Sequence, residues 1–402
     1  MYKGGVFSLI NIRSPLPVHF LNNTLKMSRT LNVFASSFNC AKVFPFDDID
    51  TQKSILEQLI PHVSQHDIYI LGFQELMSIW QGSFSYICFQ YLEDLSKLVL
   101  HRINTEETTF KCVDINCLGA IGLMVFCKEE FEVTNILKTN VKCGVFYSSL
   151  KGASVIRFSI LHEGVSDTIT CITSHLAANE GLINLEKRIQ DYHAIMSSLR
   201  NEFGEMELSH VIFTGDLNFR LNKFFGDVDY RDPDIISQLL NENDELRDVM
   251  KSERAFTQFL EPSIQFPPTF KYNISSPTDD TAQDPLSYNF KRQPSWCDRI
   301  LYSNISKDAK PTLYKAIPRT EIFHFTDHQP VILSIELPHI TPANVTRGIS
   351  SSPSPTSSTS SLSLSFGRMV DYIIGYSGWL YFKHSRMGLL VLVLFSIYLW
   401  AS

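Results

Sequence analysis

Short apolar runs with strand character recur along most of this chain, and they limit the folds that are open to it. Runs of this length, rich in β-branched and aromatic residues, are typical of buried strands. Between them, apolar side chains at helical spacing predict a helix over 184–203 with one buried face. The pattern predicts a mixed α/β domain, rich in strands, over residues 29–338. The runs lie at 31–36, 67–74, 121–127, 155–161, 168–174, 211–215, 299–303 and 330–336.

The composition changes on both sides of this domain. Residues 1–28 lack the long apolar core and the cleavage site of a signal peptide, so we interpret them as an N-terminal extension and do not expect secretion. Residues 339–368 are dominated by Ser, Thr and Pro. Such a segment cannot bury enough apolar surface to offset the entropy of ordering, so we expect a disordered linker.

Residues 369–402 resemble a membrane tail anchor. They contain an apolar run at 388–401, preceded by the basic side chains Lys383, His384 and Arg386. At about 1.5 Å per residue the run spans roughly 21–24 Å, which suits a thin bilayer such as that of the endoplasmic reticulum. We therefore expect attachment to that membrane, with the domain facing the cytoplasm. The alternative is a helix that packs on the domain or lies in the membrane interface.

Charge and cysteine usage argue against a basic nucleic-acid-binding protein and against a zinc-binding or disulfide-rich protein. The formal net charge of -7 disfavours binding of nucleic acid through overall basicity, so an anionic substrate would need a locally basic pocket. The eight cysteines lack the short paired spacings of a zinc site and the density of a small secreted scaffold. Reduced thiols are the simplest interpretation.

Polar residues of a particular kind stand at the ends of the predicted strands, where side chains leave a sheet for a common crevice. Singly, each fits a solvated carboxylate or a structural histidine. Together, carboxylate and amide oxygens with two histidines match a site that holds a hard cation and hydrolyses a phosphoester. These residues are Asn39, Glu75, His175, Asp216, Asn218, Asp298, Asp327 and His328.

Specific motifs extend this interpretation. FNCAK, FQEL, KGASVIRF, SHLAANE, GDLNFRL, FLEPSIQFPPTFKY, RQPSWCDRIL and TDHQPV occur in this order over about residues 31–337. The series resembles the inositol polyphosphate 5-phosphatases, which belong to the wider deoxyribonuclease I-like superfamily. The resemblance implies a four-layer α/β sandwich with two packed central sheets flanked by helices. It also implies Mg²⁺-dependent removal of the 5-phosphate from phosphatidylinositol 4,5-bisphosphate, which gives phosphatidylinositol 4-phosphate.

The resemblance also implies how the metal and the attacking water are held. Glu75 is the expected Mg²⁺ ligand with Asn39 beside it, since carboxylate and amide oxygens suit this cation. Asp216 is expected to align and deprotonate the water, and Asn218 to donate to the water or to the phosphoryl oxygens. Because no cysteine begins a C-x5-R phosphatase loop, we expect in-line attack without a covalent enzyme intermediate.

The two histidines and a further aspartate complete the expected catalytic set. His328, oriented by Asp298, is expected to be a cation that stabilises charge on the pentacoordinate phosphate, and His175 to contact the same oxygens. Asp327 is expected to support the metal or the histidine pair. We interpret Arg188, which lies on the predicted helix in the R-x-x-D-Y segment, as structural.

Three cations are implied as ligands of the other phosphates on the inositol ring. They are Lys151, Lys271 and Arg292. The chain departs from the family pattern at Leu150, where an asparagine is usual, and at Phe270, where a tyrosine is usual. The missing hydroxyl removes a donor to the 4-phosphate, so we expect weaker selectivity for that group.

Two rival interpretations stay open. The chain could be another enzyme of the superfamily, a nuclease or a sphingomyelinase, although PSWCDRIL and PPTFKY disfavour this. It could also be an inactive tether that binds phosphoinositides, although the retained polar set argues against that. The expected partners are a phosphoinositide lipid and a membrane, with no nucleic acid, and we expect a monomer.

Overall fold

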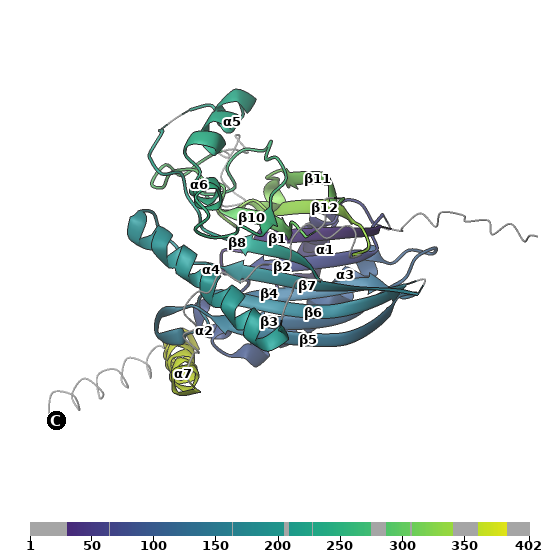
Figure 1. The fold of residues 1–402 in the computed structure, drawn as a ribbon. Coiled ribbons are helices and arrows are strands. Elements are labelled where there is room, and N and C mark those ends of the chain that lie inside the picture. Colours follow the sequence, from purple (N-terminus) through teal and green to yellow (C-terminus); the bar gives the residue numbers. More distant parts are fainter. Residues whose placement is uncertain are drawn as a thin grey trace, which may run out of the picture.

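The computed structural model describes residues 30–63, 65–162, 164–204, 209–226, 228–274, 287–305, 308–340 and 361–383. The predicted extension over 1–28 and the apolar run at 388–401 lie outside these residues. Within them, the strands form two sheets that pack face to face, with helices outside (Figure 1).

The first sheet has the strand order β11-β12-β1-β2-β4-β3. Strand β1 pairs parallel with β2 and antiparallel with β12, and Leu31 lies opposite Leu337. The two ends of the predicted domain therefore meet inside one sheet. The strands are β1 (Leu31–Asn39), β2 (Ile68–Gln74), β3 (Phe110–Leu118), β4 (Ile121–Lys128), β11 (Lys310–Ala316) and β12 (Val331–Leu337).

The second sheet has the order β5-β6-β7-β8-β10-β9. Strands β7 and β8 are parallel, and β10 runs antiparallel to β8. Each of the eight predicted strands is confirmed as part of one of the two sheets. The strands of this sheet are β5 (Glu132–Lys142), β6 (Gly152–His162), β7 (Val165–His175), β8 (Ser209–Asp216), β9 (Phe259–Leu260) and β10 (Asp298–Ser303).

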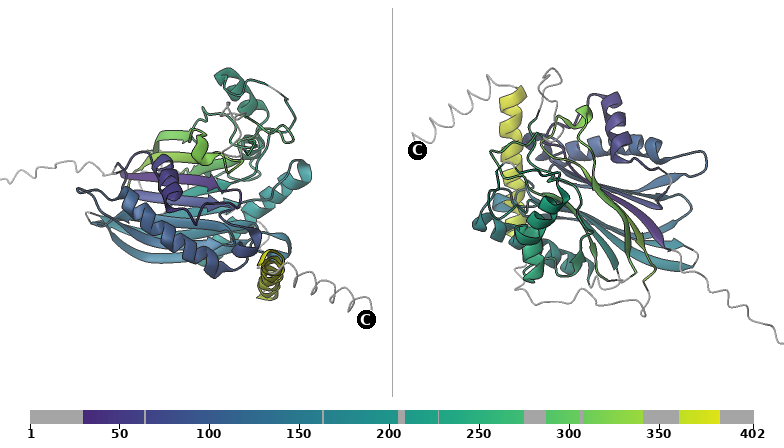
Figure 2. Two further views of the ribbon diagram at one scale, coloured as in Figure 1. Left: turned by 180° about the vertical axis from the view of Figure 1, so that it is seen from behind. Right: turned by 90° about the horizontal axis from the view of Figure 1, so that it is seen from above.

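Helices cover the outer face of each sheet and complete four layers (Figure 2). Helices α1 (Ile49–Leu59) and α3 (Ser85–Ile103) bury their apolar faces on the first sheet. Helices α4 (Leu182–Phe203) and α6 (Glu245–Lys251) do so on the second. The predicted α/β four-layer sandwich and the helix over 184–203 are thus confirmed. The remaining short elements are α2 (Ile79–Gly82), η1 (Val145–Tyr147), α5 (Pro233–Glu242) and η2 (Glu321–Phe323).

The inner faces of the two sheets form an apolar core that becomes polar toward one end. Ile70 and Val125 of the first sheet and Ile169 and Ile212 of the second belong to this core and are fully buried. Nearer the carboxyl ends of the strands the sheets approach closely at Gly72. A Cβ atom there would lie 2.6 Å from the hydroxyl oxygens of both Thr173 and Thr214, well inside van der Waals contact.

Helix α7 (Ser361–Lys383) packs beside α2 and η1. Of the predicted disordered linker over 339–368, residues 341–360 lie outside the described residues, and the prediction is corrected only for residues 361–368, which form the first turns of this helix. Composition gives no sign of this helix, because a buried carboxylate and glycines make several of its contacts with the domain. Asp371 Oδ2 lies 2.6 Å from Lys142 Nζ, and its Oδ1 accepts hydrogen bonds from the amide and hydroxyl of Ser149.

The segment 369–382, expected in the tail, also lies in α7. Of the two alternatives for the tail, packing on the domain holds for this segment. Among the described residues, no helix combines the length and the apolar character needed to cross a membrane.

The Asp371 contacts generate a first prediction. Replacing Asp371 by Ala leaves Lys142 as a partly buried cation without its partner and the amide of Ser149 without its acceptor, and breaking such a buried contact costs on the order of 3 kcal/mol. We expect α7 to detach, so that its amides exchange with deuterium far faster while those of the two sheets do not. Met369→Ala, on the exposed side of the same helix, is the matched control and should exchange like the parent protein. Unchanged protection of α7 in Asp371→Ala would contradict this account.

Candidate active site

The carboxyl ends of strands from both sheets meet at one place. Asn39 is the last residue of β1, and Glu75 directly follows β2. In the second sheet His175 and Asp216 end the parallel strands β7 and β8 opposite one another, and Asp298, which begins β10, also pairs with Asp216. The register of the strands therefore brings these side chains together, as the sequence predicts.

The carboxylate of Asp216 contacts most of the other side chains of this cluster. Its Oδ2 accepts a hydrogen bond from Asn39 Nδ2 at 2.9 Å and lies 3.3 Å from His175 Nε2 and 4.0 Å from His328 Nε2. Its Oδ1 accepts from the amide of Asn218 at 3.1 Å. Burial opposes ionisation, but the hydrogen bond with His175 and the charge of His328 hold the pKa of Asp216 well below its ordinary value. The group is an anion at neutral pH.

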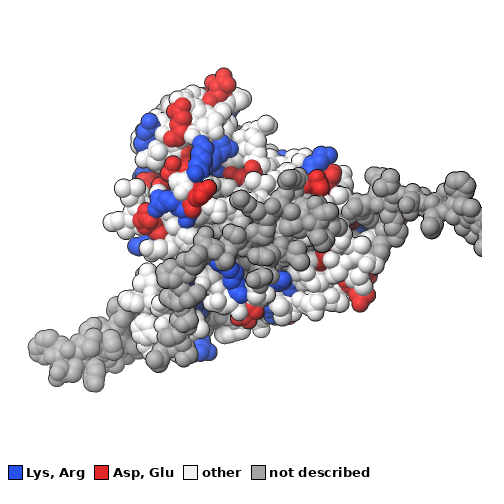
Figure 3. Space-filling view, viewed as in Figure 1, with Lys and Arg blue, Asp and Glu red and all other residues white. Residues whose placement is uncertain are grey.

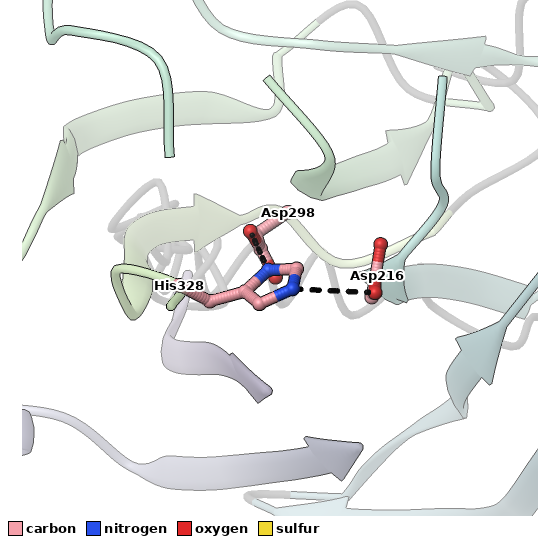
Figure 4. Close-up of side chains that lie close together, drawn as sticks. All are labelled: Asp216, Asp298 and His328. Atoms are coloured by element: carbon pink, nitrogen blue, oxygen red, sulfur yellow. Dashed lines mark hydrogen bonds and ion pairs between the residues drawn. The ribbon is translucent and has the colours of Figure 1, made fainter. Parts of the chain in front are cut away.

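His328 and Asp298 form a buried pair beside Asp216 (Figure 4). His328 Nδ1 lies 2.9 Å from Asp298 Oδ2, and that oxygen also accepts from the hydroxyl of Thr269 at 2.7 Å. Burial lowers the pKa of His328, but the charge and hydrogen bond of Asp298, with the charge of Asp216, outweigh it and raise that pKa to about 9. His328 is therefore a cation at neutral pH, with its Nε2 directed at Asp216.

His175 has the opposite electrostatic character. Burial and the neighbouring Lys151 ammonium lower the pKa of His175, so its imidazole is neutral at neutral pH. Lys151 Nζ contacts His175 Nε2 directly. Burial also lowers the pKa of Lys151, to about 8, although the charges of Asp216 and Glu75 act to raise it. Glu75 Oε2 pairs with Lys42 Nζ at 3.0 Å, and its Oε1 lies 3.9 Å from His175 Nε2.

These side chains face a cavity of about 320 Å³. Nine of the predicted residues line it, and the other two, Asn39 and Asp298, lie behind the wall and hold Asp216 and His328. On its rim Lys271 Nζ pairs with Asp327 Oδ2 at 2.9 Å, and Arg292 Nη2 donates to Asn179 Oδ1 at 3.3 Å. The nine lining residues are Glu75, Lys151, His175, Asp216, Asn218, Lys271, Arg292, Asp327 and His328.

Two cations of the cavity were missed by sequence reasoning. Arg220 donates through Nε to the carbonyl of Asn218 and stacks 4.4 Å from the ring centre of Phe270, and Lys42 pairs with Glu75. Arg220 Nη1 is buried without a hydrogen-bond partner. Both residues stand inside quoted motifs, GDLNFRL and FNCAK, so the signal was present. Lys42 and Arg220 lie a few residues beyond the ends of β1 and β8, so strand geometry alone does not predict that they reach the site.

Arg188 has the structural role that was predicted. It is fully buried and donates to the carbonyls of Ala177 and Asn179 and to Glu245. These bonds fix the loop that follows His175 and carries part of the cavity wall.

The oxygen donors of the site fit a hard divalent cation. Glu75 offers a carboxylate on the cavity wall, close to the buried carboxylate of Asp216, and Mg²⁺ or Ca²⁺ prefers such ligands. A second grouping, Asp216, Asp298 and His328, brings its ligand atoms within 4.8 Å of one another. That grouping fits a cation less well, because the raised pKa of His328 keeps a proton on the imidazole and a protonated imidazole does not bind metals.

Comparison with known proteins matches this fold and site. The model of the Endonuclease/Exonuclease/phosphatase family 2 matches residues 36–334, which is most of the chain. The chain belongs to this family. The matched segment begins in β1 and ends in β12, so it contains both sheets and the whole cavity.

Relatives within the family carry names that agree with the resemblance. The inositol-1,4,5-trisphosphate 5-phosphatase 1 of Schizosaccharomyces pombe is 32% identical over 282 residues, 67% of this chain and 24% of that protein. The phosphatidylinositol 4,5-bisphosphate 5-phosphatase INP51 of Saccharomyces cerevisiae is 28% identical over 344 residues, 81% of this chain and 34% of that protein. The chain thus spans about a quarter to a third of the length of these relatives.

A solved structure extends the comparison to three dimensions. The inositol polyphosphate 5-phosphatase domain of SpSynaptojanin was solved with inositol (1,4)-bisphosphate and a calcium ion. It superposes with a TM-score of 0.60 at 26% identity and covers 89% of this chain and 92% of that domain. The predicted resemblance to inositol polyphosphate 5-phosphatases and the deoxyribonuclease I-like fold are confirmed.

The buried pair generates a prediction about pH. Because the pKa of His328 is raised from 6.5 to about 9, the stability that it contributes is complete below pH 6.5 and is lost as the pH rises through about 9. Asp298→Asn removes the charge that holds the proton, so the His328 imidazole resonance should titrate far below pH 9 in NMR spectra, with His328→Gln to assign it. Asp167→Asn, beside His339 in another part of the fold, should leave the titration of His328 unchanged. A titration that Asp298→Asn does not move would remove Asp298 as its cause.

Proposed function

We propose that this chain is a phosphatase that removes the 5-phosphate of phosphatidylinositol 4,5-bisphosphate and depends on Mg²⁺. The observation that carries the proposal is the buried Asp298–His328 pair directed at the Asp216 carboxylate on the floor of a cavity with a basic rim. The relatives are named as phosphatases of an inositol phosphate and of a phosphoinositide, and these names support the same substrate class.

In this proposal Asp216 and His328 have different roles in in-line hydrolysis. A water molecule that donates to Asp216 would be oriented for attack on phosphorus, and the carboxylate would take its proton as the new P–O bond forms. The P–O bond to the 5-oxygen of the inositol ring breaks in the same step, and that oxygen leaves as a hydroxyl with a proton taken up from solvent. Because the pKa of Asp216 is low, orientation of the water contributes more than basicity. His328 is fixed by Asp298 through Nδ1, which leaves its Nε2–H beside Asp216 on the cavity wall, where it would stabilise the charge that develops on the phosphoryl oxygens.

Residues of this chain would hold the cation at the Glu75 side of the cavity. Glu75 is the proposed ligand, and Asn39, whose amide binds Asp216, is the proposed neighbour. When bound, the cation supplies positive charge that neutralises the phosphate. Lys42 pairs with Glu75 at 3.0 Å and also lines the cavity, so it would add positive charge beside the proposed ligand of the cation.

Cations in the cavity and on its rim would bind the remaining phosphates. We assign Lys151, Lys271 and Arg292 to this role, and Arg220 joins them because its Nη1 is buried without a partner. Phe270 lies against Arg220 and His328 and offers no hydroxyl to the 4-phosphate. The location proposed for the enzyme is the cytoplasmic face of the endoplasmic reticulum membrane, which fractionation of cells would test.

The proposal predicts a defined substrate profile. The purified chain with Mg²⁺ should release phosphate from phosphoinositides that carry a 5-phosphate and from none that lack it, and should neither nick DNA nor cleave sphingomyelin. Asp216→Ala or His328→Ala should reduce the rate by at least about a thousandfold while the protein stays folded, because both groups act on the transition state. Release from a lipid without a 5-phosphate, or more than a tenth of the parent rate in either variant, would refute the assignment.

The role of Glu75 generates a separate prediction. Glu75→Gln should raise the Mg²⁺ concentration for half-maximal rate by about tenfold or more, because a neutral amide is a poorer ligand for a hard cation than a carboxylate. Glu57→Gln, an exposed change on α1, is the matched control and should leave this concentration unaltered. If both variants respond to Mg²⁺ like the parent protein, the cation binds elsewhere.

A further inference from the structure

Helix α7 contacts the domain through its smallest residues. At Gly367 a Cβ atom would lie 2.1 Å from the carbonyl oxygen of Tyr147, and at Gly378 it would lie 2.2 Å from Trp80 Cβ. Asp371, between these glycines, is buried in the ion pair with Lys142. The helix backbone therefore lies directly on η1 and α2, and many of its large side chains are left exposed at the sides of the contact and on the outward face.

The outward side of α7 is apolar and aromatic, the reverse of an ordinary surface helix. A folded domain that faces only water rarely leaves so many large side chains exposed on one helix. Figure 3 shows the contrast: charged groups crowd the region of α5 and α6, whereas the visible part of α7 is mostly white. The exposed residues are Leu364, Phe366, Met369, Tyr372, Ile373, Tyr376, Tyr381 and Phe382.

Phe146 of η1 continues this surface, and two further exposed apolar side chains lie at the start of α4, beside the cavity. Phe146 of η1 is 64% exposed, and its ring lies 5.9 Å from that of Phe366. Leu182 and Ile183, at the start of α4, are about three-quarters exposed and follow Glu180 of the cavity wall. Figures 1 and 2 place α7 and the start of α4 on the side of the molecule where the strands end at the site.

We propose that α7 and η1 form a surface that lies on a lipid bilayer and holds the catalytic cavity toward it. The composition fits the interface of a bilayer, where Tyr and Trp rings take up positions at the level of the headgroups. A groove of about 770 Å³ between α7 and the domain is lined by such rings, among them Trp80 and Tyr372, and by Arg368 and Lys383. Those cations suit anionic headgroups.

The position of α7 in the chain favours a bilayer over a second copy of the protein. The helix ends at Lys383, and the apolar run at 388–401 begins a few residues later. A run that enters a membrane so soon after α7 leaves the helix within reach of the membrane surface. A dimer interface formed by α7 would not require an apolar run directly after the helix.

Asp371 connects this surface to the cavity. It accepts hydrogen bonds from the amide and the hydroxyl of Ser149, and Lys151, two residues later, contacts His175 in the cavity. The bilayer surface and the cavity thus share one rigid segment. If the proposed function holds, the enzyme acts on lipids of the membrane that it lies on, at a fixed orientation, instead of reaching along a flexible linker.

The test uses the full chain reconstituted in vesicles of phosphatidylcholine that contain phosphatidylserine and phosphatidylinositol 4,5-bisphosphate. The variant Tyr372→Glu with Ile373→Glu places two charges on the outward side of α7. Ser237→Glu with Gln238→Glu places the same charges on adjacent exposed positions of α5 as the matched control. Two quantities are measured: hydrogen exchange of α7 and η1 with and without vesicles, and phosphate release from vesicles and from soluble inositol 1,4,5-trisphosphate.

We expect vesicles to protect α7 and η1 from exchange in the parent protein and in the control. The α7 variant should lose this protection and at least about tenfold in rate on vesicles, with a rate on the soluble substrate within about twofold of the parent. Protection without turnover of either substrate would keep this inference and refute the proposed function. Absence of protection by vesicles, or protection that depends on protein concentration and not on lipid, would overturn the inference, the latter in favour of a dimer.

Discussion

The buried carboxylate of Asp216 is the constraint on which the site depends. An ionised group out of water is costly unless charges and hydrogen bonds compensate, and here the compensation comes from both sheets. Asn39 reaches it from the first sheet, His175 from the second, and His328 from the loop before β12. Displacing one sheet relative to the other would strip the carboxylate of partners. The cost of that loss keeps the two sheets aligned at the site.

Buried polar contacts behind the site support the same alignment. Gln74, at the end of β2, donates to the hydroxyl of Thr173 on β7 and so joins the sheets one layer below the cavity. Arg299 follows Asp298 on β10 and is fully buried between the carboxylates of Asp244 and Glu261. These bonds fix β10, and with it the carboxylate that keeps His328 protonated. Rigid support of this kind preorganises a site, which limits the reorganisation needed during reaction.

The extent to which sequence predicted this structure depended on where each residue lies. Central strands were found because both their faces are buried and they read as continuous apolar runs. The strand over Glu132–Lys142 was missed, since it lies at an edge, is mostly exposed and mixes charged with apolar residues. Residues at strand ends were identified because strand geometry places them, whereas Arg220 folds back from a loop whose course depends on tertiary contacts. The first turns of helix α7 were assigned to the linker because residues 361–368 are rich in serine and contact the domain partly through glycine, which composition does not weigh.

The close approach of the two sheets at Gly72 has a consequence for how this chain can vary. Position 72 contacts no reacting atom, yet even alanine there would press against Thr173 and Thr214 and push the sheets apart one layer below the cavity. A substitution at position 72 is therefore expected to damage the site through packing alone, although it changes no catalytic group. The resulting loss of activity would arise in the core between the two sheets, at a residue that does not line the cavity.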